Sequence, residues 1–324
     1  MADLWIQFLL TIDATVRVAT PLILCAMAGL FSERSGIIDI SLEGKMLIAA
    51  FAAGTLAALT GSALTGLAGA IAVSVLFSLV HGFACITHKG NQVISGLAIN
   101  ILASGLTVTL GIAIFAKGGQ TPMRGRDERF GAIDLPFAEA ANALPFIGPI
   151  YKEIISGHNI LVWVALAAVW ITSRVVFRTA FGLRLRAVGE KPEAVDTAGI
   201  SVSGLRYRAV IIAGILCGIA GAYLSIAHGA GFVREMTSGK GYIALAALIF
   251  GNWRPVPALA ACLMFGFLDA VAARLQGVEV PVLGQIPTDL ILVLPYVLTV
   301  ILLAGFIGKA TPPLAIGTPY IKER

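Results

Sequence analysis

Long apolar segments with few charged residues are the feature that most restricts how this chain can fold. Of its 324 residues, 58% are hydrophobic and only 13% are charged, whereas soluble domains carry about 25% charged residues. A helix of about 20 apolar residues crosses the hydrocarbon core of a bilayer, and several segments reach that length. The sequence therefore predicts an all-α, polytopic membrane protein.

Nine apolar segments are candidate transmembrane spans. Small residues are frequent within them, as the close packing of helices in a bilayer requires. The second segment contains charged residues and the seventh is short, so we expect discontinuous helices at both. Residues 1–10 carry an acidic rather than a basic start, which favours a short interfacial helix over a cleaved signal peptide. The predicted spans are residues 15–31, 38–59, 62–86, 93–116, 160–177, 207–227, 238–251, 256–273 and 286–307.

Basic residues in the loops predict the orientation of the chain. Residues 174–208 contain seven Lys or Arg side chains against three acidic ones, and short basic loops remain on the cytoplasmic side. Counting spans from this loop places the amino terminus and residues 117–159 outside, and the carboxy-terminal tail inside. The net charge of +5 is thus explained by orientation, and no nucleic-acid partner is expected.

Two short sequence patterns occur twice, in the same order. Leu24–Gly29 reads LCAMAG and Leu216–Gly221 reads LCGIAG, while residues 44–49 and 239–244 share Gly-Lys followed by Ile-Ala. With the predicted orientation, the two copies cross the membrane in opposite directions. We therefore expect two inverted halves, residues 15–116 and 160–307, as is common in transporters. The alternative is chance agreement between helices rich in alanine and glycine.

The sequence lacks the motifs of an enzyme that hydrolyses ATP. Neither Gly239-Lys240 nor Gly308-Lys309 has the earlier glycine and the following hydroxyl residue of a phosphate-binding loop. The cysteines lie in apolar segments and the histidines are scattered, so we expect buried thiols and no metal site. The chain is predicted to be a transport protein, and any coupling to ATP must come from a partner.

A short helix is predicted within the basic loop, residues 178–206. Pro192 suits the first turn of a helix and Gly199 suits its end. Ala194, Val195 and Ala198 are three or four residues apart and share one face. An apolar face on a cytoplasmic loop favours docking against a partner; the alternative is a solvated connector.

Three segments resemble the permease subunits of ATP-binding-cassette importers of the ribose and branched-chain-amino-acid type. They are Arg186–Pro192 through Gly199-Ile200, which is similar to the coupling-helix loop, Ser35–Gly44, and Gly239–Gly251 with Trp253. The last two are most similar to nucleoside-type members. Within the first, Lys191 and Val195 depart from the residues usual in the family.

The resemblance implies that residues 1–324 form one transmembrane permease domain in the bacterial inner membrane. Its partners would be ABC ATPase subunits that bind ATP, a second permease chain, identical or homologous, an extracytoplasmic substrate-binding lipoprotein, and membrane lipid. The chain itself would bind no cofactor. The residues implied to couple it to the ATPase are Gly189, Glu190, Pro192, Ala194, Val195, Ala198 and Gly199.

Polar residues that interrupt the apolar segments are candidates for the substrate path, because ionisable groups within a membrane are usually functional. For the two acidic residues that open the second span, the alternative is a structural pairing with Arg34 or Lys45. For the amides, the alternatives are a helix cap at Asn91 and Gln92 and a bond from Asn100 to a neighbouring helix. The candidates are Asp39, Ser41, Glu43, Lys45, Asn91, Gln92, Asn100 and Lys240.

Three transport functions remain open from the sequence. The leading hypothesis is an ATP-driven importer of nucleosides. The second keeps the same machine but moves ribose or another simple sugar. The third is an ion-coupled secondary transporter, against which stands the lack of an obvious carboxylate in the middle of a span.

Overall fold

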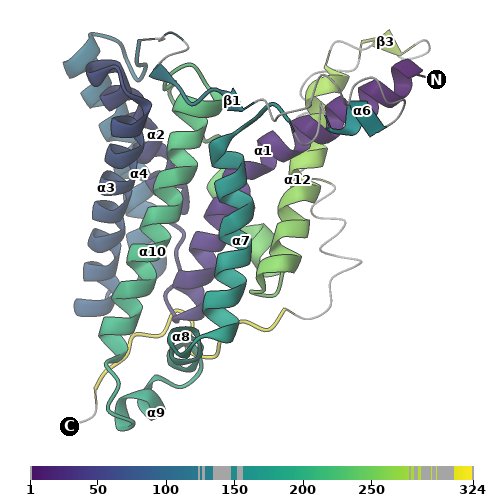
Figure 1. Ribbon diagram of the computed structural model, residues 1–324. Helices are drawn as coiled ribbons and strands as arrows, with labels where there is room; N and C mark the ends of the chain where they lie inside the picture. Colours follow the sequence, from purple (N-terminus) through teal and green to yellow (C-terminus); the bar gives the residue numbers. More distant parts are fainter. Residues whose placement is uncertain are drawn as a thin grey trace.

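A computed structural model shows a bundle of long helices with short helices at both ends (Figure 1). The structure describes residues 2–122, 125, 128–133, 147–151, 156–276, 279–280, 284–285, 293, 297 and 310–322.

Seven helical segments of the described chain are long and apolar enough to cross a membrane. Two of them, α3 and α10, continue without a break into a turn of wider helix, η1 and η4. The seven are α1 (Ala2–Arg34), α2 (Leu42–Thr60), α3 (Ala63–Gly82) with η1 (Phe83–Thr87), α4 (Gln92–Phe115), α7 (Ile160–Arg178), α10 (Val202–Tyr223) with η4 (Leu224–His228), and α12 (Pro255–Leu275).

The shorter elements lie at the ends of the bundle or begin within it. α6 (Ile147–Ile150) and two antiparallel strand pairs share the end that carries the amino terminus (Figure 1). Ala132 pairs with Asn159 in the first strand pair, and Glu279 pairs with Gln285 in the second. The remaining elements are α8 (Ala180–Glu190), α9 (Pro192–Thr197), α11 (Lys240–Phe250), β1 (Ala132–Ile133), β2 (His158–Asn159), β3 (Glu279–Val280) and β4 (Gly284–Gln285).

The all-α prediction is confirmed, and seven of the nine predicted spans coincide with these seven segments. The predicted seventh span, 238–251, is the 11-residue helix α11. At 1.5 Å per residue it is about 16 Å long, too short to cross a hydrocarbon core of about 30 Å alone. The ninth, 286–307, lies outside the described residues except for Val293 and Val297.

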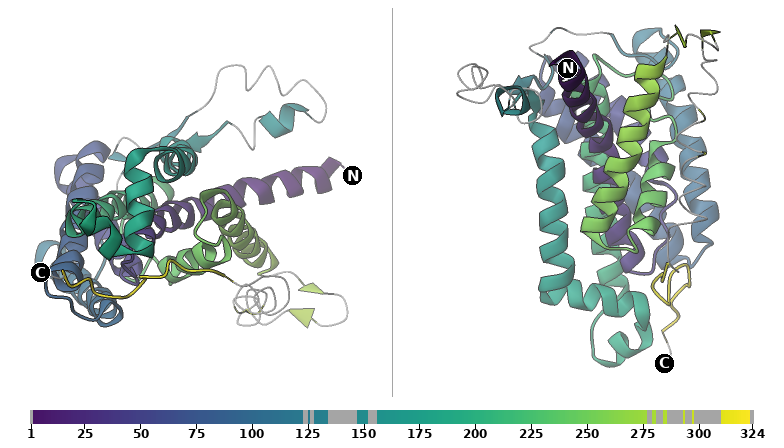
Figure 2. Two further views of the ribbon diagram at one scale, coloured as in Figure 1. Left: turned by 90° about the horizontal axis from the view of Figure 1, so that it is seen from below. Right: turned by 90° about the vertical axis from the view of Figure 1, so that its right-hand side faces the viewer.

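Two predicted helix starts were wrong. Residues 2–10 do not form a separate interfacial helix, because α1 runs without interruption to Arg34 and crosses the molecule obliquely (Figure 2). The second span begins at Leu42 rather than at residue 38. Residues 35–41 form a buried, non-helical connection instead.

The centre of the bundle consists of α1, α2 and α10. In their most apolar windows, 78% of α1 and 83% of α2 residues are buried, against 28% for α3 and 22% for α4. The two copies of the LC-x-x-AG pattern lie against each other, with the Sγ atoms of Cys25 and Cys217 4.0 Å apart. All four cysteines are buried thiols, as predicted. The inverted relation of the halves stays a prediction.

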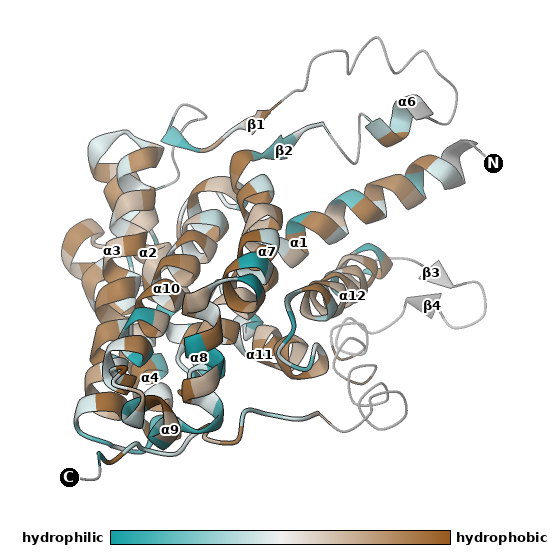
Figure 3. Ribbon diagram, turned by 60° about the horizontal axis from the view of Figure 1, so that its bottom comes forward, coloured by the Kyte–Doolittle hydropathy of each residue, from teal (hydrophilic) through white to brown (hydrophobic). Residues whose placement is uncertain are grey.

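The basic loop and the tail, which are both predicted to be cytoplasmic, lie at one end of the bundle together with the segments that follow α1 and α11 (Figure 1). Arg34 donates a hydrogen bond to the carbonyl of Trp253, and the buried Arg206 donates one to the carbonyl of Ser35. The tail, residues 310–322, crosses this end beneath the bundle, where Ala315 N donates to the carbonyl of Gly189. Hydrophilic residues are frequent there on α8 and in the tail (Figure 3).

Candidate substrate path and coupling surface

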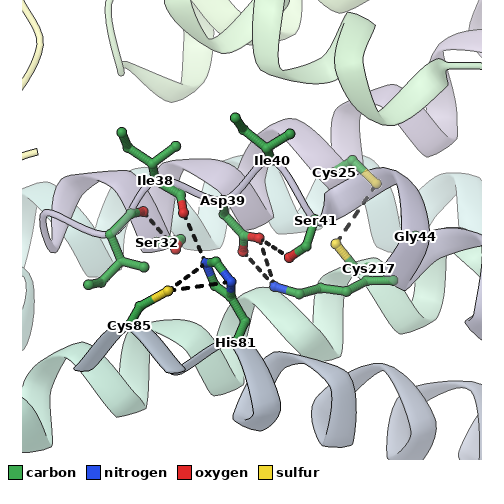
Figure 4. A network of polar contacts seen from close by, with 12 residues as sticks. Cys25, Ser32, Ile38, Asp39, Ile40, Ser41, Gly44, His81, Cys85 and Cys217 are labelled. Carbon is green, nitrogen blue, oxygen red and sulfur yellow. Dashed lines mark hydrogen bonds and ion pairs between the residues drawn. The ribbon is translucent and has the colours of Figure 1, made fainter. Parts of the chain in front are cut away.

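The connection between α1 and α2 contains a buried ion pair. Nζ of Lys45 lies 2.7 Å from one carboxylate oxygen of Asp39 and 2.8 Å from the other, and both side chains are fully buried (Figure 4). Ser41 Oγ donates a further hydrogen bond to the same carboxylate. Burial of a carboxylate is costly unless it is paired, and the Lys45 ammonium and the Ser41 hydroxyl supply the partners of Asp39.

The same connection is held from α3 and α4. Nε2 of His81 lies 3.0 Å from the carbonyl oxygen of Ile38, which can only accept, so this nitrogen carries the proton. The side chain of Gln92 accepts a hydrogen bond of 2.7 Å from Ile38 N. The buried backbone of a non-helical segment needs such partners. These contacts therefore stabilise the break between α1 and α2 within the protein.

Glu43 binds the start of α11 across almost two hundred residues of sequence. Its carboxylate accepts hydrogen bonds from Gly239 N at 2.8 Å and Gly241 N at 2.6 Å. A negative charge at a helix N-terminus is favourable, because unpaired N–H groups and the helix dipole point there. A Cβ atom on Gly241 would lie 2.5 Å from Glu43 N, so only glycine allows this approach.

The side chain of Asn100 links α4 to the starts of α2 and α11. Its Oδ1 accepts from Gly44 N at 2.8 Å, and its Nδ2 donates to the Ile40 carbonyl at 3.1 Å and to Tyr242 Oη at 2.8 Å. One amide thus contacts the α1–α2 connection, the first turn of α2 and the first turn of α11. The predicted bond from Asn100 to a neighbouring helix is confirmed.

The structure gives the substrate-path candidates different roles. Asp39, Ser41 and Lys45 form one buried cluster, so the structural alternative describes them, while Glu43 caps α11 instead of pairing with a basic residue. The predicted helix cap holds for Asn91, whose Oδ1 accepts from Val93 N at 2.9 Å, whereas the side chain of Gln92 binds Ile38 N instead. Those with partly open side chains are Asn100 and Lys240.

The helix predicted in the basic loop is present as α9. Pro192 occupies its first turn, and Gly199 follows its end with a φ of +76°, where glycine is favoured. The side chain of Glu190, at the end of α8, is exposed and accepts a hydrogen bond from Leu314 N. The tail therefore lies beside this loop.

The apolar face predicted on α9 is used in two ways. Val195 is buried and packs with Val202 and Leu205 of α10, which fixes α9 to the bundle. Ala194 and Ala198 are exposed. The sequence could not tell the buried valine from the exposed alanines, because their exposure depends on the position of α10.

An apolar hollow of about 470 Å³ opens between α8 and α9. Leu183, which is 62% exposed, and Ala187 belong to it although the sequence did not single them out. The amphipathic pattern of α8 could have identified both residues from the sequence. The lining residues are Leu183, Arg184, Ala187, Glu190, Lys191, Ala194, Val195, Ala198 and Ile200.

Two of the residues implied in coupling lie behind this surface. Gly189 is buried against the end of α1, and a Cβ atom there would lie 2.2 Å from the carbonyl oxygen of Arg34. Pro192 is buried as well. They position the loop, whereas Glu190 and the two alanines of α9 face outward.

Fold and site together define a multi-pass membrane transport protein with broken helices at its centre and an apolar hollow at one end. The family described as branched-chain amino acid transport system, permease component, matches residues 11–303. The chain belongs to this family and is a transport subunit of the bacterial plasma membrane. Membership decides against the ion-coupled secondary transporter.

Relatives named as transporter permeases match most of the chain. The guanosine ABC transporter permease protein NupQ of Bacillus subtilis is 39% identical over 97% of both chains. The nucleoside ABC transporter permease protein NupC of Lactococcus lactis is 37% identical over 94% of this chain and 95% of its own. The putative glucose ABC transporter permease protein TsgC13 of Haloferax volcanii is 36% identical over 83% of this chain and 78% of its own.

Proposed function

We propose that this chain is the membrane-spanning permease subunit of an ATP-driven nucleoside importer. The observation that carries the proposal is its likeness, end to end, to permeases named for guanosine and nucleosides. The described structure supports it with a polar, non-helical connection between α1 and α2 that is buried within the protein, as the broken helices of transporters are. The partners we propose are ABC ATPases, a second permease chain and a substrate-binding lipoprotein.

The second candidate cargo is a simple sugar. The relative named as a putative glucose permease favours it, although the likeness covers less of the chain. A ribonucleoside contains a pentose, so the two cargoes share hydroxyl groups and differ in the aromatic base. Competition for uptake therefore separates them.

The deciding experiment is uptake by the complex reconstituted into proteoliposomes. We expect ATP-dependent uptake of radiolabelled guanosine that is lost when this chain is omitted. A large excess of unlabelled glucose or ribose should leave that uptake unchanged. Uptake of glucose with no uptake of any nucleoside would overturn the proposed cargo, and guanosine uptake that persists without this chain would overturn the proposed role.

We further propose that the hollow between α8 and α9 receives a segment of the ATPase. Exposed apolar side chains at the cytoplasmic end of a membrane protein need a partner surface. The relatives are named ABC transporter permeases, which supports an ATPase as that partner. If the ATPase binds α8 and α9 differently in its two states, this contact shifts the helical bundle between its own two states.

Leu183→Glu should therefore uncouple the transporter. A carboxylate in an apolar contact is costly to bury, so we expect guanosine uptake to fall at least about tenfold, which corresponds to about 1.4 kcal/mol. Less ATPase should co-purify with the permease, while the amount of permease in the membrane stays unchanged.

Ile321→Glu is the matched control, because Ile321 in the tail is 64% exposed and lies outside the hollow. We expect uptake and ATPase recovery in this variant to equal those of the wild type. Equal losses in both variants would show that added charge, and not the hollow, is responsible.

A further inference from the structure

A strip of polar side chains lies on an open face of the chain at the middle depth of the bundle. Asn100 and Ser104 are one helical turn apart on α4 and therefore share a face. Ser104 donates a hydrogen bond to the Glu235 carboxylate, and Asn100 donates one to Tyr242 Oη. Both bonds lie on the exposed surface. Neither Ser104, Glu235 nor Tyr242 was predicted from the sequence.

Its depth is set by α4. Ser104 is 12 residues after Gln92 and 11 before Phe115, so it lies at the centre of a helix about 36 Å long. Glu235 is bonded to Ser104 and is at the same depth. An ionisable side chain in the hydrocarbon centre faces protein or a water-filled cavity, because lipid cannot solvate it.

The rest of α4 has the opposite character. Most of its exposed side chains are apolar, among them Leu102, which is 49% exposed and nearly opposite Ser104 on the helix. One side of α4 is therefore suited to lipid, and the strip is suited to water.

The backbone before α11 holds Glu235 at this position. Glu235 and Ser238 have φ values of +53° and +47°, which residues other than glycine rarely adopt. The segment is fixed at its start, where Thr121 N donates to the Phe232 carbonyl and Phe232 N donates to Thr121 Oγ1. Such strain persists only where the surroundings impose it, and it is frequent at functional sites.

We propose that this strip is the nucleoside-contacting wall of the translocation path, with Tyr242 stacking on the base and Glu235 accepting hydrogen bonds from ribose hydroxyls. The proposal rests on the proposed function and adds the residues that would recognise the cargo. Tyr242 is 44% exposed, so its ring is open to a ligand. A carboxylate accepts hydrogen bonds from hydroxyl donors, and an aromatic ring stacks on any base.

The composition of the strip suits weak, transient binding of a transported solute rather than tight binding. It offers one aromatic ring, one carboxylate and two small polar side chains on an open surface. A transported solute must bind well enough to enter and weakly enough to leave. Tight binding therefore falls to a partner outside the membrane, and the strip selects during passage.

Cysteine accessibility tests whether the strip is wet and whether nucleoside covers it. The four native cysteines are buried, so the wild-type chain supplies a low background. In the assembled complex, we expect Ser104→Cys to react with a positively charged methanethiosulfonate reagent and to be protected by guanosine. Leu102→Cys, on the opposite side of α4, should not react.

The outcomes of this labelling separate the possibilities. If Ser104→Cys reacts no faster than Leu102→Cys, the strip does not line an aqueous path and the proposal fails. If Ser104→Cys reacts but guanosine gives no protection, the path is wet but the strip does not contact nucleoside, which also overturns the proposal.

Substitution of Tyr242 tests recognition of the base. Tyr242→Leu should lower the maximal rate of guanosine uptake about tenfold, as loss of one stacked aromatic does elsewhere. Tyr242→Phe keeps the ring and should retain most of the rate. Phe267→Leu on α12, where Phe267 is 41% exposed, is the matched control and should transport like the wild type. Equal rates for Tyr242→Leu and the control would refute base stacking.

Glu235→Gln tests recognition of the sugar. Glutamine keeps the size of the side chain and an acceptor for Ser104, but removes the charge. We expect the preference for guanosine over 2′,3′-dideoxyguanosine to fall at least about threefold, because the weaker acceptor gains less from ribose hydroxyls. An unchanged preference would count against the ribose contact.

Failure of this proposal differs from failure of the proposed function. If the wild-type complex takes up no nucleoside, the proposed function itself is wrong. If the wild type takes up guanosine while the strip variants behave like their controls, only the strip assignment is wrong.

Discussion

Lys45→Met should destabilise the folded protein more than any other single loss of charge that the described structure suggests. The substitution leaves the fully buried Asp39 carboxylate without its ammonium partner. Loss of one member of a buried ion pair costs about 3–5 kcal/mol. We expect little monodisperse protein after extraction in detergent and a lower midpoint of thermal unfolding.

The double variant Asp39→Asn with Lys45→Met distinguishes a missing charge from a missing lysine. It removes both charges together, and we expect it to recover most of the lost stability, because paired removal is often nearly neutral. Lys117→Met, at an exposed lysine, is the control for loss of a lysine elsewhere and should unfold like the wild type. A double variant no more stable than Lys45→Met would contradict the buried-pair explanation.

Recovery of stability need not restore transport. The pair holds the non-helical connection between α1 and α2, next to the first turn of α2 where Gly44 N binds Asn100. If transport requires the connection to keep this shape, the double variant will be stable but will take up guanosine slowly. Comparison of its unfolding midpoint with its uptake rate therefore separates folding from transport.

The long helices were predictable because hydropathy is a local property. Each of the seven spanning helices depends on about 20 consecutive apolar residues, so the sequence located them within a few positions except at the start of α1. The start of α2 was misplaced for a physical reason. Residues 37–41 include apolar Ile37, Ile38 and Ile40, but their backbone is bonded to His81, Gln92 and Asn100 instead of to a helix.

The candidate site was predicted less well, because its contacts join distant segments. Polarity within an apolar segment marked Glu43 as functional, yet its partners are backbone N–H groups at the start of α11. No periodicity shows that pairing. Tyr242 and Glu235 were missed for the same reason, since only the fold brings the first turn of α11 and the segment before it beside Asn100 and Ser104 of α4.

The loop that contains α9 was predicted better than the candidate site but less completely than the long helices. Pro192 and Gly199 carry local information and predicted both ends of α9. Which alanine or valine of that helix faces outward depends on α10, far along the chain. Sequence therefore located the element, while the fold decided that Leu183 and Ala187 of α8 complete its surface.

Gly241→Ala should give the second large effect, on transport more than on insertion. An added Cβ atom would lie 2.5 Å from Glu43 N and 2.6 Å from Glu43 Cα, and backbone cannot yield as a flexible side chain does. The methyl group must therefore push α11 away from α2 and lengthen both hydrogen bonds that Glu43 accepts. Overpacking of this kind costs about 1–3 kcal/mol, and the lost cap adds about 1 kcal/mol.

Gly105→Ala on α4 is the matched control, because a Cβ atom there meets nothing within 4 Å. Alanine is favoured over glycine within a helix by about 1 kcal/mol, so this variant should be as stable as the wild type or more so. We expect Gly241→Ala to lower the midpoint of thermal unfolding and to reduce guanosine uptake at least about tenfold. Because α11 carries Tyr242 against Asn100, a displaced α11 also separates the strip. If Gly241→Ala transports as well as Gly105→Ala, the close approach of α2 and α11 is not needed for transport.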